Sequence, residues 1–211
     1  MEEQYRSLRT AVSAQIKVEG SRFIADAFPV TGSEEAEAHL AAVRKKYFDA
    51  THHCFAFLTG PFAIAQSRAS DDGEPSGTAG VKILSALRSA ECSDALIVVT
   101  RYFGGTKLGV GGLGRAYHDA ASSVLSTASY RTKALVQELT VAFPFTETNP
   151  VMTIVHGGQF RILNTEYTED RTVMTLGIFP SQMEALRLRI TDATRAQAEL
   201  TTGPTRTILW D

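Results

Sequence analysis

The sequence predicts an α+β protein made of two domains, and three observations support this. The chain has 211 residues, which exceeds the commonest size of one domain and is too short for three. Residues 95–100 form an apolar, largely β-branched run, which predicts a central strand covered on both faces. Residues 132–211 show strand and helix patterns in the order βαββαβ, which predicts a second, smaller pair of layers.

The spacing of apolar residues predicts the elements of the first domain, residues 1–131. Gly20 lies in the turn of a hairpin, and Ser33 with two following glutamates begins a helix. From Leu113 onward, apolar side chains recur at i, i+3 and i+4, which indicates an amphipathic helix. The predicted elements are strands 16–18 and 22–30, helix 33–47, strand 52–58, a returning strand 63–68, helix 78–91, strand 95–100 and helix 113–128.

A polar stretch at residues 129–133 predicts the domain boundary, which we place between Arg131 and Thr132. In the second domain, residues 132–211, a proline just inside a helix start and a glycine just past its end follow the usual asymmetry of helix termini. The predicted elements are strand 135–143, a helix entered at 148–150 and ended at 157–158, strands 160–167 and 172–179, helix 180–194 and strand 205–210. This order is that of a ferredoxin-like fold.

The composition is that of a soluble globular protein, with 44% hydrophobic and 21% charged residues. A formal net charge of -2 gives no overall attraction to nucleic acid or to an anionic membrane, so a polyanion would need a local basic face. The N-terminus lacks the apolar region of a signal peptide, and no apolar run approaches the ~20 residues that span a bilayer. We therefore expect a cytoplasmic protein with no membrane partner.

Several other patterns give no catalytic, cofactor or metal site. Cys54 and Cys92 do not form a Cys-x-x-Cys pair, so both are expected to be reduced, small hydrophobic residues. Residues 109–114 match G-x-G-x-x-G, but they do not directly follow a strand of a parallel βαβ unit, as a dinucleotide fingerprint does. His52 and His53 point to opposite faces of a predicted strand, which is wrong for a shared metal. No cofactor, metal or catalytic residue is predicted.

The first glycine-rich segment, residues 71–80, carries three carboxylates within four positions: Asp71, Asp72 and Glu74. Such convergence is what a metal ion or an acid–base pair requires. The alternative, which we favour, is a solvated turn before a helix whose N-terminal dipole attracts the carboxylates. The spacing lacks the alternation of ligands that defines a calcium loop.

The second glycine-rich segment, residues 101–109, begins at the carboxyl end of the predicted central strand, where open α/β sheets bind ligands. Its cations, Arg101 and Lys107, fit phosphate groups, and the backbone N–H groups of Gly104 and Gly105 fit an anion-binding nest. A structural alternative is equally open, in which the glycines carry a tight crossover and Arg101 pairs with a carboxylate of the first segment.

The two segments together resemble the IMPACT/YigZ family. Asp-Asp-Gly-Glu-Pro-Ser-Gly-Thr-Ala-Gly at 71–80 and Arg-Tyr-Phe-Gly-Gly-Thr-Lys-Leu-Gly at 101–109 are long motifs at the separation expected for that family. The resemblance covers residues 20–128 as an IMPACT N-terminal-type domain. It implies a first domain similar to domain 2 of ribosomal protein S5, a second, ferredoxin-like domain similar to one of an elongation factor, and a cytoplasmic location.

For bacterial members the resemblance implies a nucleic-acid or ribosome-associated role with no established reaction. Eukaryotic members regulate translation with an additional RWD domain, so their protein partner is not carried over to this chain. The motif positions carried over are Asp71, Asp72, Glu74, Arg101, Lys107 and Arg115.

We therefore predict a non-catalytic protein that binds RNA or the translation machinery and could regulate translation. Arg101, Lys107 and Arg115 would contact phosphates, and Tyr102 or Phe103 would stack on a base. The competing hypothesis is an enzyme or small-ligand binder that uses the same segments for a nucleotide phosphate. A protein-interaction adaptor is a third alternative, and the oligomeric state is left open.

Overall fold

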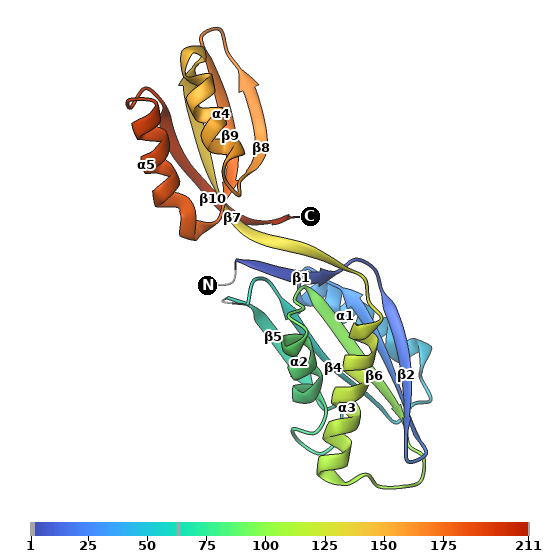
Figure 1. Ribbon diagram of the computed structural model, residues 1–211. Helices are drawn as coiled ribbons and strands as arrows, with labels where there is room; N and C mark the ends of the chain where they lie inside the picture. Colours follow the sequence, from blue (N-terminus) through green and yellow to red (C-terminus); the bar gives the residue numbers. More distant parts are fainter. Residues whose placement is uncertain (1–2, 63, 211) are drawn as a thin grey trace. The chain divides into compact units, whose positions relative to one another are not determined.

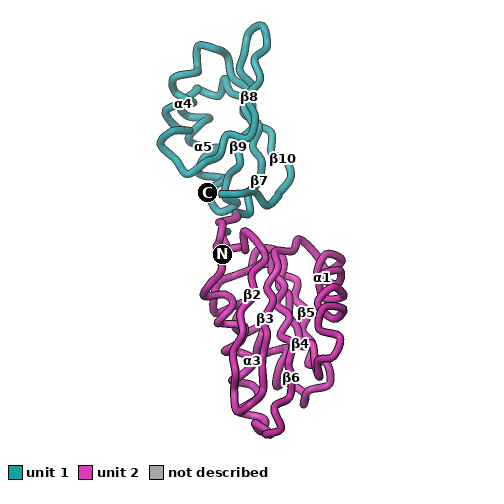
Figure 2. Tube along the Cα trace, turned by 90° about the vertical axis from the view of Figure 1, so that its right-hand side faces the viewer, with its two compact units in different colours: residues 1, 3, 134–210 teal, residues 2, 4–133, 211 magenta. Residues whose placement is uncertain are grey.

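The computed structural model describes residues 3–62 and 64–210. Over these residues the chain is a mixed α+β protein, as predicted, with two antiparallel sheets and five α-helices. It divides into two compact units, shown in different colours in Figure 2: the N-terminal unit, Gln4–Lys133, and the C-terminal unit, Ala134–Trp210, to which Glu3 also belongs. Residue 63, the first of the predicted returning strand, lies outside the described residues.

The N-terminal unit contains a five-stranded sheet in the order β2-β3-β6-β4-β5. Strand β6 is central because its residues are apolar and β-branched and are buried on both faces, as the sequence predicts. The elements are β1 (Gln4–Leu8), β2 (Val12–Val18), β3 (Ser21–Pro29), α1 (Ser33–Lys46), β4 (His52–Thr59), β5 (Gln66–Ser70), α2 (Gly80–Ser89), β6 (Ala95–Tyr102) and α3 (Gly109–Ser126).

Helices cover both faces of this sheet (Figure 1). Helices α2 and α3 pack on one face, where Phe23, Ile97 and Tyr117 belong to one buried cluster. Helix α1 packs on the other face, where Leu40 and Val98 belong to a second cluster. Because successive side chains of a strand point to opposite faces, β3 and β6 contribute to both clusters.

The C-terminal unit has the predicted element order βαββαβ, and its strands lie in the order β10-β7-β9-β8. Its core contains Leu139, Leu176 and Ile190, which come from β7, β9 and α5. The elements are β7 (Tyr130–Pro144), a 3-10 turn (Phe145–Glu147), α4 (Thr148–His156), β8 (Arg161–Tyr167), β9 (Arg171–Ile178), a second 3-10 turn (Pro180–Gln182), α5 (Met183–Ala193) and β10 (Glu199–Leu209).

The structure differs from the sequence prediction at several element boundaries. Strand β1 was not predicted, because its only apolar side chains are Tyr5 and Leu8, too few to show a period. Helix α3 begins at Gly109, not at Leu113. The sequence prediction missed its first turn because four of the first six residues are glycines, which have a poor intrinsic preference for helix. Strands β2, β7 and β10 also begin four to six residues earlier than predicted.

Among residues 3–62 and 64–210, no helix combines the length and apolar character that crossing a bilayer requires.

Candidate nucleic-acid interface

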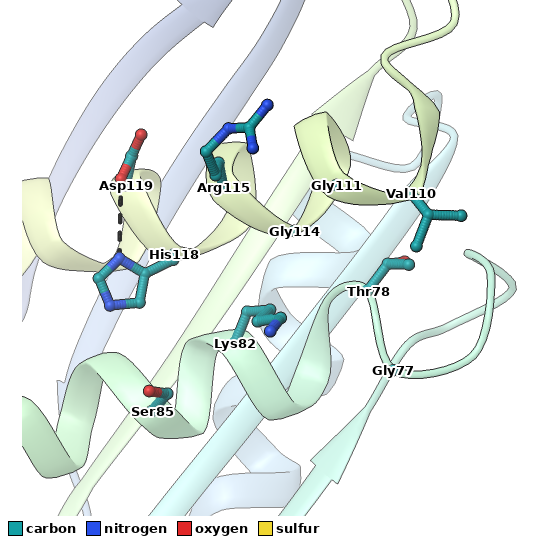
Figure 3. A pocket seen from close by; sticks show the side chains of 10 residues that line it. All are labelled: Gly77, Thr78, Lys82, Ser85, Val110, Gly111, Gly114, Arg115, His118 and Asp119. Atoms are coloured by element: carbon teal, nitrogen blue, oxygen red, sulfur yellow. Dashed lines mark ion pairs between the residues drawn. The ribbon is translucent and has the colours of Figure 1, made fainter.

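The end of the first glycine-rich segment and the start of α3, the helix that follows the second segment, line one groove of the N-terminal unit. The groove lies between the start of α2 and the first turns of α3 and has a volume of about 370 Å³ (Figure 3). Both helix starts contribute to its walls, as their positions after the two motifs require. The lining residues are Gly77, Thr78, Lys82, Ser85, Val110, Gly111, Gly114, Arg115, His118 and Asp119.

Asp71 caps the N-terminus of α2 from outside the helix. Its carboxylate accepts hydrogen bonds from the backbone N–H groups of Gly77, Ala79 and Gly80, at 2.8 to 2.9 Å. Partial burial acts to raise the pKa of Asp71, but the three backbone donors outweigh it and lower that pKa below its ordinary value. These donors are therefore occupied by the protein itself, and the start of α2 is already neutralised.

Asp72 fastens the same loop to β4 and α1. Its Oδ2 accepts a hydrogen bond from the backbone N–H of His53 at 2.7 Å, and its Oδ1 pairs with Arg44 at 2.7 Å. Its backbone has a φ of 43°, in the left-handed region that aspartate tolerates better than most residues. Asp71 and Asp72 thus have structural partners, in agreement with the favoured interpretation of this segment as a turn before a capped helix.

Glu74 and Arg101 form an ion pair in the interior. The Nη1 of Arg101 lies 2.6 Å from Oε1 of Glu74, and the two side chains are 7% and 5% exposed. The hydroxyl of Tyr117 donates to the same oxygen at 2.8 Å. Of the two alternatives left open for Arg101, the structure shows the ion pair. The expected phosphate contact of Arg101 is therefore withdrawn, because its guanidinium is buried and already paired.

The two aromatic residues after β6 differ in their availability. The hydroxyl of Tyr102 donates to Asp49 at 2.8 Å, and Arg22 lies over the Tyr102 ring, 4.2 Å from its centroid. The bond to Asp49 raises the pKa of Tyr102, since it favours the protonated hydroxyl. Phe103 is 49% exposed, so one part of its ring is open to a stacking partner. Phe103 remains the better candidate for contact with a base.

Gly104 and Gly105 have separate roles. A Cβ on Gly104 would overlap the backbone of Gly20, and the Gly104 N–H donates to the hydroxyl of Ser21 at 3.2 Å. Gly104 is therefore needed for close packing of two loops, and its N–H is occupied by the protein. Gly105 is exposed with a φ of 89°, a conformation that L side chains rarely adopt, and nothing lies within 4 Å of the position of its missing Cβ.

The free cations of this face are Lys82, Lys107 and Arg115. All three are exposed, and within the described part of the chain none forms an ion pair or hydrogen bond. Lys82 and Arg115 line the groove, whereas Lys107 lies in the loop just before α3. Lys82 reaches from α2 towards α3, because Gly114 leaves space there: a Cβ on Gly114 would lie 3.3 Å from Lys82 Cε.

Lys82 was not among the sequence-predicted site residues. It occupies an outward position of an amphipathic helix, where the default environment is solvent, so sequence gave no reason to select it. The signal that could have found it is the glycine at position 114, since a glycine facing a neighbouring helix indicates close approach of another group. His118 and Asp119, which form an ion pair at 3.6 Å when the histidine is protonated, complete this wall of the groove.

The N-terminal unit is thus an α+β domain with exposed cations at a groove between the starts of α2 and α3. The Impact N-terminal domain matches residues 19–125, which lie within this unit. Both motifs of the site fall inside the matched range. The chain belongs to the IMPACT family.

Relatives match over most of the chain. The IMPACT family member YvyE of Bacillus subtilis is 32% identical over 199 residues, which cover 94% of this chain and 91% of that protein. The IMPACT family member YigZ of Escherichia coli is 29% identical over 185 residues, covering 87% and 90%. A solved structure described as that of a hypothetical protein is 28% identical, with a TM-score of 0.63 and coverage of 95% and 97%.

Proposed function

We propose that the N-terminal unit binds RNA, in the context of the translation machinery, through the face that carries Lys82, Lys107 and Arg115. The observation that supports this is the exposure of three cations that have no ionic partner among the described residues, two of which line an open groove. Phosphate contacts from lysine and arginine supply most of the affinity of non-specific nucleic-acid binding. The chain as a whole has a formal charge of -2, so the attraction is local to this face.

The remaining parts of the proposal concern the folds and the cell compartment. The N-terminal unit is taken to be similar to domain 2 of ribosomal protein S5, and the C-terminal unit to be ferredoxin-like. The strand order β10-β7-β9-β8 supports the second assignment, because it places the first and third strands of the βαββαβ unit side by side at the centre. A cytoplasmic location and a regulatory, non-catalytic role follow from the proposed partner.

A second candidate function is the binding of a nucleotide or another small phosphate ligand. The observation in its favour is the volume of the groove, about 370 Å³, which lies within the range of small-molecule sites. Lys82 and Arg115 would then hold the phosphate. The two functions differ in the length of ligand that they need, because a small ligand fills the groove while a strand also reaches Lys107.

The experiment that tests the proposal measures RNA binding by a charge-removal variant. We expect fluorescence anisotropy with a labelled single-stranded RNA to show a loss of about tenfold or more in affinity for Lys82→Ala/Arg115→Ala. The matched control is Lys45→Ala/Arg189→Ala, which also removes two exposed cations but leaves the groove intact. Equal losses in both variants would contradict a specific role for the groove.

A thermal-shift comparison separates the two candidate functions. A ligand that binds only the folded state raises the unfolding temperature by mass action. RNA binding predicts stabilisation by an oligonucleotide and none by mononucleotides at the same phosphate concentration. Stabilisation by one mononucleotide, abolished in Lys82→Ala/Arg115→Ala, would instead establish the small-ligand function.

A further inference from the structure

A second groove lies on the opposite face of the N-terminal sheet, beside α1. Its volume is about 340 Å³. Helix α1 makes its main contacts with β3, β4 and β6, so the edge strand β2 remains open on this face. The residues that line the groove are Ala11, Val12, Ser13, Asp26, Phe28, Ala42, Val43 and Lys46. None of them belongs to the groove between α2 and α3.

Asp26 is a buried carboxylate with too few partners. The residue is 4% exposed, and its Oδ2 has no hydrogen-bond partner. Its one ion pair among residues 3–62 and 64–210 is with Lys46, whose Nζ lies 3.6 Å from Oδ1 and whose side chain is 59% exposed. Buried carboxylates are normally paired and hydrogen-bonded, because removing a charge from water is costly. The unpaired Oδ2 of Asp26 therefore indicates a hydrogen-bond donor from a bound molecule.

The surroundings of Asp26 specify the chemistry of that donor. Ser13 pairs directly with Asp26 across strands β2 and β3, so both side chains project from the same face of the sheet. Apolar side chains, including Phe28, Ala42 and Val43, form the walls. A group that satisfies all these features carries N–H donors and a positive charge at its tip and an aliphatic stem behind it.

We propose that this groove binds an alkylguanidinium or alkylammonium group, the chemistry of an arginine or lysine side chain. The cationic tip pairs with Asp26 and receives further support from the Ser13 hydroxyl, while the stem packs against the apolar walls. The ammonium of Lys46 is displaced from Asp26 towards solvent, which its exposed position permits. The groove, with a volume of about 340 Å³, has room for one such side chain.

Titration of the full chain with butylguanidinium, followed by ¹H–¹⁵N NMR, tests this proposal. We expect saturable shifts at Val12, Ser13 and Asp26, and none with 1-butanol, which has the stem without the charge. Asp26→Asn should weaken binding by about tenfold or more, since it removes the charge that the ligand pairs with. Lys46→Met should strengthen binding by about 2- to 5-fold, because it removes a competing cation.

Lys45→Met is the matched control, because Lys45 is the exposed neighbour of Lys46 and does not line the groove. Its affinity should equal that of the natural chain. The proposal is overturned if neither the natural chain nor Lys46→Met shows saturable shifts, or if Asp26→Asn binds equally well. The Lys46→Met variant keeps the test decisive even if Asp26→Asn does not fold.

A comparison of two ligands identifies the source of the cation. A short peptide with one central arginine and with acetyl and amide end groups should bind more tightly than butylguanidinium if the groove receives a polypeptide side chain, because flanking backbone adds contacts along the open edge of β2. Equal affinity assigns the groove to a free amine or guanidine. Both results support the cation site, and neither depends on RNA binding, which Lys82→Ala/Arg115→Ala tests separately.

Discussion

Arg101 donates a hydrogen bond to Glu74 in the interior of the N-terminal unit, with 2.6 Å between Nη1 and Oε1. The two residues come from the two glycine-rich segments, so this ion pair joins motifs that are separated by a helix and a strand. The hydroxyl of Tyr117 on α3 shares the same carboxylate oxygen. The buried ion pair therefore links the two motifs inside the unit, while Lys82, Lys107 and Arg115 are exposed.

The first prediction concerns the strength of that ion pair. Arg101→Met leaves Glu74 as a buried charge without its cation, so we expect a loss of about 3–5 kcal/mol in the free energy of unfolding. Urea denaturation measures it. Lys107→Ala, the control, should change stability by no more than about 0.5 kcal/mol, because Lys107 is exposed. An Arg101→Met protein as stable as the natural chain would show that the pair is dispensable.

The second prediction separates two kinds of glycine. Gly104→Ala should cost about 2 kcal/mol or more, since its Cβ would overlap the backbone of Gly20. Gly105→Ala should cost about 1 kcal/mol through its positive φ alone, and Gly105→Asn less, because asparagine tolerates that region. Urea midpoints give the order. Equal costs for Gly104→Ala and Gly105→Ala, or no recovery with Gly105→Asn, would contradict these assignments.

The third prediction is a pH dependence carried by Asp71. Its folded-state pKa is lowered, so the unfolded chain binds the proton first as pH falls, and the stabilisation by the carboxylate is lost as pH drops from about 4 through the folded pKa. Relative to the natural chain, Asp71→Asn should lose about 1–2 kcal/mol at pH 7. The difference should shrink below pH ~4. A difference that stays constant down to acid denaturation would mean that the charge contributes nothing.

The fourth prediction concerns the two thiols. Burial is the main cause that raises the pKa of Cys54 and of Cys92, in each case to about 12. The thiolate is the reactive form, so neither residue should react with iodoacetamide at pH 8 while the protein is folded. Mass spectrometry should show two modified cysteines only after addition of denaturant. Modification of the folded chain at the rate of a free thiol would contradict this burial.

The sequence predicted the elements whose local pattern is unambiguous. Residues 95–100 became the centre of β6 because an apolar β-branched run can be stable only when both faces are covered. Strand β1 was not predicted because its pairing partners lie far along the chain. Arg6, for example, forms a β-bridge with Cys92. The prediction missed the first turn of α3 because glycine has a weak helix preference, which tertiary packing overrides in the folded protein.

The sequence predicted which part of the chain carries the candidate site, but it did not predict which cations are free. Arg101 is paired with Glu74, whereas Lys82 lines the groove. The starts of the two helices that follow the motifs line one groove, but its lining among the described residues includes none of the second motif, 101–109. Sequence could not decide whether Arg101 would face solvent or Glu74, since that depends on the tertiary position of a carboxylate 27 residues away. It also could not select Lys82 among the exposed positions of α2, because its importance arises from the proximity of α3.

The salt dependence of RNA affinity tests the central claim most directly. The logarithm of the binding constant falls linearly with the logarithm of salt concentration, with a slope set by the number of phosphates neutralised. Lys107→Ala and Arg115→Ala should each reduce that slope by about one, and Lys45→Ala should leave it unchanged. If Lys107→Ala and Arg115→Ala both keep the slope of the natural chain, that result contradicts the proposed interface.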